Sequence, residues 1–473
     1  MLDFETNDVH GVEADGDFHR LKTDVHERLV SQINVGMLRA LDPHVVRDEV
    51  RRGAEAICND QLGLLSQADQ ERLIDEVVFE AIGLGPLETL MSDPTVSDIL
   101  INGPHRVYVE RNGRLEPTQV RFRDFDHLLS IVQRLVGRIG RRIDEASPIV
   151  DARLPDGSRL NAVMRPLALD DMLVSIRRFS QKPLLIWDLV GKRSATSEMI
   201  EFLTACVRAH LNIMISGGTG SGKTTLLNAL SASIAPDERI VTIEDAAELR
   251  LQQPHVARME SRPKNLEGRG EVTPRALLCN ALRMRPDRII VGECRGAEAF
   301  DMLQAMNTGH HGSMTTIHAN DTRDAVTRLE MLLGMAAPEL PLTFIRRQIT
   351  SAIDIVVQTM RVAGGARKIT QISEITGMQG ETVSMHDLFH FEQSDIDDSG
   401  NALGTFMAAG IQPQCLPRLR RAGVEISIDI FNRGFFASSI HSDDHSIHFS
   451  GDGFAVDPRD DHPADDGLLR SLR

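Results

Sequence analysis

A glycine-rich run that ends in a lysine and two threonines carries the clearest chemical signal in the chain. Residues 217–225 read Gly-Gly-Thr-Gly-Ser-Gly-Lys-Thr-Thr, after a short apolar run and before two leucines. Glycines at this spacing let backbone N–H groups surround a polyphosphate, while Lys223 reaches the outer phosphates and the Thr224 hydroxyl completes a Mg²⁺ shell. The flanking residues predict a strand before the loop and a helix after it. We therefore expect a nucleoside triphosphate to bind at Gly217, Gly218, Thr219, Gly220, Ser221, Gly222, Lys223, Thr224 and Thr225.

Two later apolar runs end in carboxylates. Residues 239–245 and 287–293 each contain a β-rich apolar stretch that is typical of a buried parallel strand. Carboxyl ends of parallel strands meet at one sheet edge, so Glu244, Asp245 and Glu293 are expected beside the phosphate loop. Phosphoryl transfer to water needs a metal ligand and a group that orients the water, and Glu293 and Glu244 are the candidates. Either acid alone would equally well be a strand-end cap or a surface ion pair, and the phosphate loop favours the functional interpretation.

The composition excludes several classes of protein. The chain has 473 residues, a net charge of −16 and 41% apolar residues, which allows about three globular domains and argues against a surface that wraps nucleic acid. Its five cysteines are widely spaced without a Cys-x-x-Cys pair, so we predict neither disulfides nor zinc, and a reducing cytosol. The acidic N-terminus lacks a basic and an apolar segment, and no apolar run approaches the ~18 residues of a membrane span. We expect membrane contact only through partners.

Changes of pattern along the chain predict its domain organisation. Apolar residues recur at helical spacing up to about residue 90, and Asn112-Gly113 and 155–157 then mark tight turns between short strands. Four histidines and eight aspartates among the last 40 residues indicate a solvated tail without a fixed metal site. The predicted parts are a disordered acidic leader (1–24), a helical bundle (25–91), an α+β domain (92–182), a linker (183–191), an ATPase domain with a C-terminal helical part (192–433) and a disordered tail (434–473).

Four motifs in fixed order resemble those of the type II/type IV secretion ATPase superfamily. Residues 217–225, 242–245, 285–293 and 309–320 resemble its Walker A motif, Asp box, Walker B motif and His box, and Walker B ends in Gly-Glu, as it does in that superfamily. The helical N-terminal region and the segments 155–161, 175–179 and 380–391 further resemble the CpaF/TadA branch, which powers tight-adherence (Flp) pili. The resemblance covers roughly residues 21–433. It implies an α/β fold with a RecA-like P-loop ATPase domain, preceded by an α+β domain and an N-terminal helical bundle.

The same resemblance implies a role for each candidate residue. Lys223 and Thr224 would bind phosphate and Mg²⁺, Glu293 would be the Walker B acid and hold Mg²⁺ directly or through water, and Glu244 would polarise the attacking water. His318 would couple the γ-phosphate to conformation, although a lone histidine at a strand end is by itself more often structural. Nothing comparable supports His310 or His311, and Cys294 beside the Walker B acid fits a small buried residue without a role.

Cationic groups are also needed where negative charge develops. Arg159 and Arg177 match family arginines that reach the nucleotide across a domain cleft, whereas their simplest structural role would be in surface salt bridges. Whether they act within one subunit or across an interface stays open. Further candidates are Arg275, Arg283, Arg285 and Arg295.

The function implied by the resemblance is that of a homohexameric motor. It would hydrolyse ATP to drive assembly of a tight-adherence type IV pilus through inner-membrane platform proteins, and whether it also drives retraction stays open. It would lie in the cytoplasm, peripheral to the inner membrane, with no direct contact to nucleic acid. Two alternatives stay open, namely a type IV secretion ATPase for protein or DNA export, and a nucleotide-gated scaffold that does not hydrolyse ATP.

Overall fold

The described part of the chain belongs to one compact unit. In this computed structural model it comprises residues 21, 22, 24, 25, 28, 29, 43–61, 66–111, 113–178, 184–262, 264 and 269–436. Most of the predicted leader (1–24) and nearly all of the predicted tail (434–473) lie outside these residues, as does the start of the predicted linker. None of the helices within the described ranges has the length and apolar character that crossing a membrane requires.

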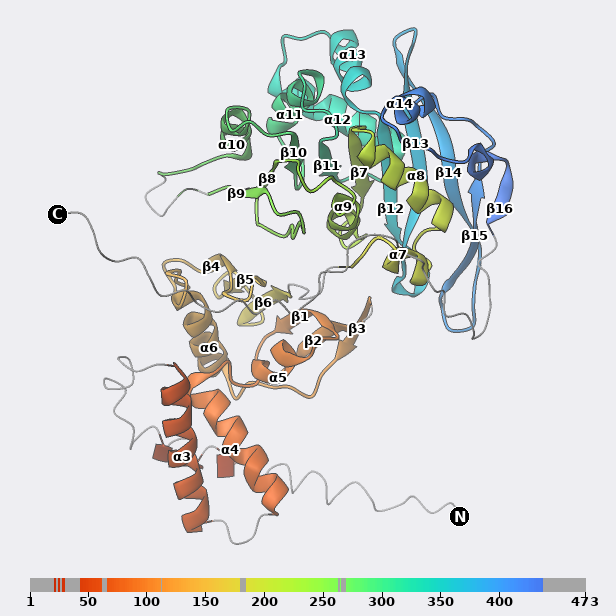
Figure 1. Ribbon diagram of the computed structural model, residues 1–473. Helices are drawn as coiled ribbons and strands as arrows, with labels where there is room; N and C mark the ends of the chain where they lie inside the picture. The colour runs from red at the N-terminus through yellow and green to blue at the C-terminus, as the bar shows by residue number, and fades with distance from the viewer. Residues whose placement is uncertain are drawn as a thin grey trace, which may run out of the picture. The chain divides into compact units, whose positions relative to one another are not determined.

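The N-terminal region contains two helices that pack against each other, α3 (Pro43–Gln61) and α4 (Gln67–Ile82) (Figure 1). Their contact is apolar, because Val50, Ala54 and Val77 are fully buried between them. At the far end of α4, Glu80 contacts the next domain: its Oε1 lies 2.6 Å from Nε2 of His127. Burial opposes ionisation of Glu80, but the hydrogen bond from His127 and the charge of Lys22 lower its pKa to about 2.

A six-stranded antiparallel sheet follows the short helix α5 (Leu87–Ser92). Its strand order is β3-β2-β1-β6-β5-β4, and helix α6 (Phe125–Gly137) contributes Ile131 and Val132 to its core. The turn predicted at 155–157 joins the paired strands β4 and β5. The strands before and after the turn predicted at Asn112-Gly113, β2 and β3, are also paired, and Asn112 itself lies outside the described residues. The strands are β1 (Val96–Asn102), β2 (Val107–Arg111), β3 (Arg114–Pro117), β4 (Ile149–Arg153), β5 (Arg159–Met164) and β6 (Met172–Arg177).

Strand β6 shows why this sheet has two different faces. Met172, Val174 and Ile176 are buried, whereas the alternating residues Leu173 and Arg177 are exposed. Successive side chains of a strand point to opposite faces, so the apolar set covers the domain core and the other set is free to meet a second part of the molecule.

The second sheet has ten strands in the order β16-β15-β14-β13-β12-β7-β11-β10-β8-β9. Strands β12, β7, β11, β10, β8 and β9 run parallel, and β13 to β16 are added antiparallel. The strands are β7 (Ile213–Gly217), β8 (Ile240–Glu244), β9 (Val256–Glu260), β10 (Arg288–Val291), β11 (Met314–Ile317), β12 (Ile355–Arg361), β13 (Arg367–Gln379), β14 (Thr382–Ile396), β15 (Ala402–Ala408) and β16 (Gly434–Phe436).

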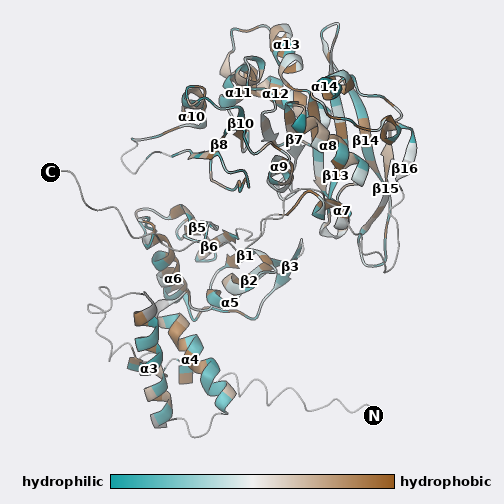
Figure 2. Cartoon of the chain, viewed as in Figure 1, coloured by the Kyte–Doolittle hydropathy of each residue, from teal (hydrophilic) through white to brown (hydrophobic). Residues whose placement is uncertain are grey.

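Helices cover both faces of this sheet, which is why its parallel strands are apolar throughout. Along β7, Ile213 and Ile215 belong to one core and Met214 to the other, and Figure 2 shows apolar residues gathered at this central strand. The α/β class is therefore confirmed. The first core includes α8 (Ser197–Arg208), α9 (Lys223–Ser231) and α14 (Leu416–Arg421), and the second includes α10 (Pro274–Ala281), α11 (Glu298–Asn307), α12 (Thr322–Ala336) and α13 (Leu342–Ala352).

The C-terminal part of the ATPase region differs from the expected helical part. After α13 the described chain is mainly strand, and the pair β13 and β14 is the longest hairpin in it. Between these strands and β16, only α14 and the short 3-10 helix Ile428–Phe431 are helical. In β14, Val383 and Met385 alternate with polar residues, a period of two that favours a strand, and this alternation breaks at Leu388 and Phe389, where the register with β13 shifts.

Candidate active site

The phosphate loop connects β7 to α9 and lies at the carboxyl edge of the parallel strands (Figure 1). Two of its glycines are required by the geometry. A Cβ on Gly217 would collide with the carbonyl oxygen of Thr359, and Gly222, the N-cap of α9, has a φ of 99°, which is left-handed. The loop thus turns tightly into a helix N-terminus, where unpaired backbone N–H groups favour an anion.

Lys223 lies within this loop and is 8% exposed. Its ammonium donates to the carbonyl oxygens of Gly217 and Gly218, both at 2.9 Å. Burial lowers its pKa. The lysine therefore already sits at the mouth of the loop, where phosphate oxygens can replace the two carbonyls as its partners.

Glu244 ends β8 and is 4% exposed. Its Oε1 accepts the backbone N–H groups of Glu248 and Leu249, each at 2.7 Å, whereas its Oε2 has no hydrogen-bond partner among the described residues. Burial raises the pKa of Glu244 to about 7, although the two backbone hydrogen bonds act in the opposite direction. A buried carboxyl oxygen without a partner is available to a water molecule or a metal ion.

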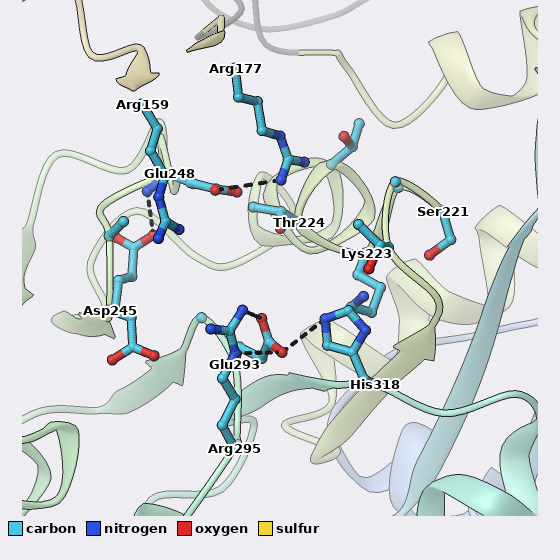
Figure 3. A pocket seen from close by; sticks show the side chains of 17 residues that line it. Arg159, Arg177, Ser221, Lys223, Thr224, Asp245, Glu248, Glu293, Arg295 and His318 are labelled. Atoms are coloured by element: carbon cyan, nitrogen blue, oxygen red, sulfur yellow. Dashed lines mark hydrogen bonds and ion pairs between the residues drawn. The ribbon is translucent and has the colours of Figure 1, made fainter. Parts of the chain in front are cut away.

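Glu293 follows β10 and lies against an arginine and a histidine side chain (Figure 3). Arg295 donates from Nη2 to Oε2 of Glu293 at 2.9 Å, and its Nε lies 2.9 Å from Oε1. Nε2 of His318, which follows β11, lies 3.0 Å from the same Oε1. Burial and then the charge of Lys223 lower the pKa of His318, which favours its neutral form at neutral pH. The geometry thus places Glu293, the predicted Walker B acid, in direct contact with His318 of the predicted His box.

Arg159 and Arg177 reach the site from the N-terminal sheet (Figure 3). They are cross-strand partners in β5 and β6, so their side chains lie on the same face of that sheet. Both are roughly half exposed; Arg159 forms a two-point ion pair with Asp151, and Nη1 of Arg177 lies 3.8 Å from Oε1 of Glu248. Within a single chain, both arginines therefore line the pocket that holds the phosphate loop.

One cavity of about 170 Å³ brings the predicted residues together. Gly217 and Gly218 are not among its lining residues. The predicted residues that line it are Arg159, Arg177, Thr219, Gly220, Ser221, Gly222, Lys223, Thr224, Thr225, Glu244, Glu293 and His318.

The remaining predicted acid and arginines differ in whether they line the cavity. Arg295 and Asp245 line the cavity, whereas Arg275, Arg283 and Arg285 do not. Sequence reasoning missed Glu248, the partner of Arg177; its only signal is a carboxylate in the loop that follows a motif strand.

Two side chains without an assigned role lie outside the cavity. His310 contacts the carbonyl oxygen of Ala305 through Nδ1. Cys294 is buried between Met302 and Thr315, and burial raises its pKa to about 12. A thiol with so high a pKa is not a reactive thiolate at neutral pH.

The oxygen donors at the cavity fit a magnesium–phosphate complex. Mg²⁺ prefers hard oxygen ligands and is usually bound by one or two protein groups together with substrate phosphates. The Thr224 hydroxyl, the Glu293 carboxylate and the unpaired Oε2 of Glu244 all lie at this cavity. These residues could hold the ion, and the loop and arginines could hold the triphosphate.

Comparisons with known proteins agree with this chemistry. The family described as Type II/IV secretion system protein matches residues 80–386. A Mycobacterium tuberculosis protein with a conjugal-transfer name is 36% identical over 326 residues, covering 68% of this chain and 92% of that protein. The type IV secretion system protein VirB11 of Bartonella quintana is 33% identical over 325 residues, covering 61% and 91%. The solved VirB11 ATPase of the Brucella suis type IV secretion system, in complex with sulphate, is 29% identical, with a TM-score of 0.34 and coverage of 64% and 96%.

The family match includes the phosphate loop, both acids, His318 and the two arginines of the N-terminal sheet. It spans well over half of the chain, and the mycobacterial relative is matched over nearly its whole length. The chain therefore belongs to the type II/IV secretion system protein family and is a P-loop ATPase.

Proposed function

We propose that this ATPase is the hexameric motor that assembles a tight-adherence type IV pilus. The observation that carries the proposal is that one cavity combines hydrolytic groups of the ATPase sheet with arginines of the N-terminal sheet. A nucleotide bound there contacts both parts of the chain. ATP binding is thereby coupled to the arrangement of the two parts, which a motor requires.

Each residue has a defined task in the proposed cycle. Lys223 and the loop N–H groups bind the β- and γ-phosphates, and Arg159 and Arg177 leave Asp151 and Glu248 to contact the γ-phosphate. Glu244 orients the attacking water and accepts its proton, a task that suits a carboxyl with a pKa of about 7. Thr224 and Glu293 would hold Mg²⁺, which neutralises phosphate charge when it is bound. His318 couples the γ-phosphate to the conformation of the chain through Glu293, with which its side chain is in contact.

Loss of the γ-phosphate then ends the contacts of the arginines with the nucleotide. The two parts of the chain are free to separate, and in a closed ring this movement is passed to the neighbouring subunits. The partner that receives the force would be a platform protein of the inner membrane, and the motor would lie in the cytoplasm at that membrane. The net charge of −16 supports a protein partner over nucleic acid.

A second candidate function is protein or DNA export by a type IV secretion system. The names of the relatives favour it, since they refer to conjugal transfer and to VirB11. However, the VirB11 relative covers 61% of this chain although 91% of its own length is matched. Helix α3 and most of α4 precede the family match, and β15 to β16 follow it. These additional elements support a separate branch, as the resemblance to CpaF/TadA proteins implies.

The test is complementation of cells that lack this gene. Wild type, Glu293→Gln and the control Glu201→Gln, an exposed residue of α8, are expressed at matched levels while surface pili and exported protein are measured. We expect pili with wild type and Glu201→Gln and none with Glu293→Gln. Unchanged pili in the deletion strain would contradict the pilus assignment and favour export. Pili restored by Glu293→Gln would instead indicate a scaffold that needs no hydrolysis.

The proposed ring has its own test. Specific ATPase activity should rise with protein concentration, because subunits have to assemble before every site is complete. Activity is measured over a hundredfold dilution series while light scattering reports the mass of the complex. A specific activity that stays constant as the particle falls apart would contradict a hexameric motor.

A further inference from the structure

Five charged residues form one cross-strand row across the N-terminal sheet. Each is the register partner of the next, so all five side chains lie on the face that carries the arginines of the nucleotide cavity. From β2 to β4 the row reads Glu110, Asp98, Arg177, Arg159 and Arg153. Arg177 and Arg159 of this row line the nucleotide cavity, whereas Glu110 at its acidic end contacts the ATPase sheet at a different place.

Glu110 at the acidic end binds two arginines of the ATPase sheet. The residue is 9% exposed, and its two carboxylate oxygens accept from Nη1 of Arg361 and from Nη2 of Arg367, both at 3.2 Å. These arginines end β12 and begin β13, where they are register partners. Arg361 also donates to the carbonyl oxygen of Gly113. One carboxylate of the N-terminal sheet thus orients two guanidinium groups that lie 251 and 257 residues away in the chain.

Arg367 in turn contacts the phosphate loop. Its Nε donates to the carbonyl oxygen of Gly220 at 2.9 Å, and its Cδ lies 3.4 Å from where a Cβ of Gly222 would be. Strand β12 adds a further contact, because the hydroxyl oxygens of Thr359 and Ser221 are 2.9 Å apart. The loop is therefore held from the side opposite to its phosphate-binding face.

The two sheets also meet at the turns that join β2 to β3 and β12 to β13, where there is no space for side chains. Gly113 and Gly365 have φ values of +81° and +83°, and a Cβ on either would lie 2.6 Å from the carbonyl oxygen of the other. The two hairpin tips therefore pack backbone against backbone. This close approach fixes the distance over which Glu110 and Arg367 meet.

The hydrogen bond to the Gly220 carbonyl oxygen also orients a backbone donor, the N–H of Ser221 in the same peptide unit. In a trans peptide the C=O and the next N–H point in opposite directions, so the hydrogen bond from Arg367 sets the direction of the Ser221 N–H. That N–H donates to the Gly218 carbonyl oxygen at 3.4 Å, a long hydrogen bond that a phosphate oxygen can readily replace. Ser221 itself lines the nucleotide cavity.

We propose that Arg367 is a positioning residue for ATP binding, and that Glu110 of the N-terminal sheet holds it in place. Through this pair, the position of the N-terminal sheet sets the shape of the phosphate loop, and so the loop is ready for ATP only when the sheet is docked. The inference concerns the ATP site alone and does not depend on whether the motor serves a pilus or export.

The test compares KM and kcat for Mg-ATP in the full chain, together with the Kd of a fluorescent ATP analogue. Variants are Arg367→Ala, Arg367→Lys, Glu110→Gln and the double variant Glu110→Gln/Arg367→Ala. Arg346→Ala is the matched control, because Arg346 also forms a two-point ion pair, with Glu330, and donates to a backbone carbonyl, that of Glu381. The thermal unfolding midpoint of every variant is measured to detect loss of folding.

Arg367→Ala should raise KM and Kd about tenfold and change kcat less than about threefold. Without Arg367, ATP binding itself has to order the loop, and this free energy lowers the affinity rather than the rate of the chemical step. Glu110→Gln should raise KM about threefold, and the double variant should match Arg367→Ala, because both residues act through one contact. Arg367→Lys should restore little, since its ammonium lacks the fork that reaches Glu110 and Gly220 together.

Three results for these variants would overturn the proposal, and a fourth would come from the control. They are an unchanged KM and Kd in a folded Arg367→Ala protein, full rescue by Arg367→Lys, and effects of Glu110→Gln and Arg367→Ala that multiply. If Arg367→Ala does not fold, Glu110→Gln and Arg367→Lys decide the question by the same criteria. A rise in KM for the control Arg346→Ala equal to that of Arg367→Ala would likewise show a general effect of lost ion pairs.

Discussion

The two sides of the phosphate loop are built in opposite ways. On the nucleotide side, charged groups have partners that can be exchanged: the side chain of Arg177 is 54% exposed, and its Nη1 lies 3.8 Å from Glu248. On the other side, the Glu110 side chain is 12% exposed and binds two arginines, and two glycines touch backbone to backbone. The difference shows which groups can move to a ligand and which ones hold the loop for it.

The largest loss is expected on the nucleotide side. Lys223→Ala should lower kcat/KM about 1000-fold, because it removes the cation that contacts both outer phosphates in a site where such a donor is worth several kcal/mol. Steady-state turnover of Mg-ATP measures this. Lys264→Ala, which removes an exposed lysine beside Glu271, should leave turnover within about twofold. Retention of a tenth of wild-type activity by Lys223→Ala would contradict the assigned site.

The arginines of the N-terminal sheet should have the next largest effect. Arg177→Ala should lower kcat/KM about 30-fold, since it removes charge that stabilises the γ-phosphate in the transition state. The matched control is Arg275→Ala, which breaks an ion pair of 2.7 Å with Asp301 outside the cavity. If both variants have equal activity, Arg177 has only the role of a surface ion pair.

On the opposite side of the loop, the expected effect is on stability. Gly365→Ala places a Cβ against the carbonyl oxygen of Gly113 at a left-handed φ, and should lower the free energy of unfolding by about 2 kcal/mol. Chemical denaturation measures this. Gly400→Ala, with a φ of +80° and no atom within 4 Å of its Cβ position, separates the cost of φ alone from that of the contact. Equal losses in the two variants would show that the hairpin tips do not depend on close packing.

The smallest predicted effect is a pH dependence. Since burial raises the pKa of Glu244 to about 7, this carboxyl loses its proton, and becomes able to act as a base, only as pH rises through that value. We expect kcat/KM, which reports the free enzyme, to rise about tenfold from pH 6 to pH 8. The residual activity of Glu244→Gln should lack this limb. A wild-type profile that is flat over this interval would exclude Glu244 as the base.

The raised pKa of Glu244 also affects stability: its contribution to the free energy of unfolding falls as pH rises, whereas activity rises. The folded state favours protonated Glu244, so its contribution is full below a pH of about 4.5 and is lost as pH rises through about 7. Glu244→Gln removes this loss. The free energy of unfolding of the variant, relative to that of wild type, should therefore be higher at pH 8 than at pH 5. Chemical denaturation of both proteins at the two pH values measures this difference.

Local patterns were enough to predict the loop and the acids. Lys223 belongs to a glycine-rich spacing that is typical of a phosphate-binding loop. The apolar runs before Glu244 and Glu293 are continuous, as in buried parallel strands, whose carboxyl ends meet at one edge of the sheet. The α/β class followed from the same runs. Arg159 and Arg177 could be named only through resemblance, because their side-by-side position depends on the pairing of β5 with β6.

Long-range contacts were beyond the sequence. Arg367 lies 257 residues from Glu110, and no periodicity relates a carboxylate of one sheet to a guanidinium of another. Glu248 lies in a loop, where neither strand nor helix spacing applies. The long hairpin of β13 and β14 was not predicted, because register shifts interrupt the two-residue alternation that would identify its strands. The predicted domain boundaries stay predictions.

The most direct measurement is a structure of the Glu293→Gln chain bound to Mg-ATP. The triphosphate should lie along the phosphate loop with Lys223 at its outer phosphates, and Arg177 should have left Glu248 for the γ-phosphate. The carbonyl of Gly220 should keep its hydrogen bond from Arg367. A nucleotide bound at the loop while Arg159 and Arg177 stay with Asp151 and Glu248 would contradict a site shared between the two sheets.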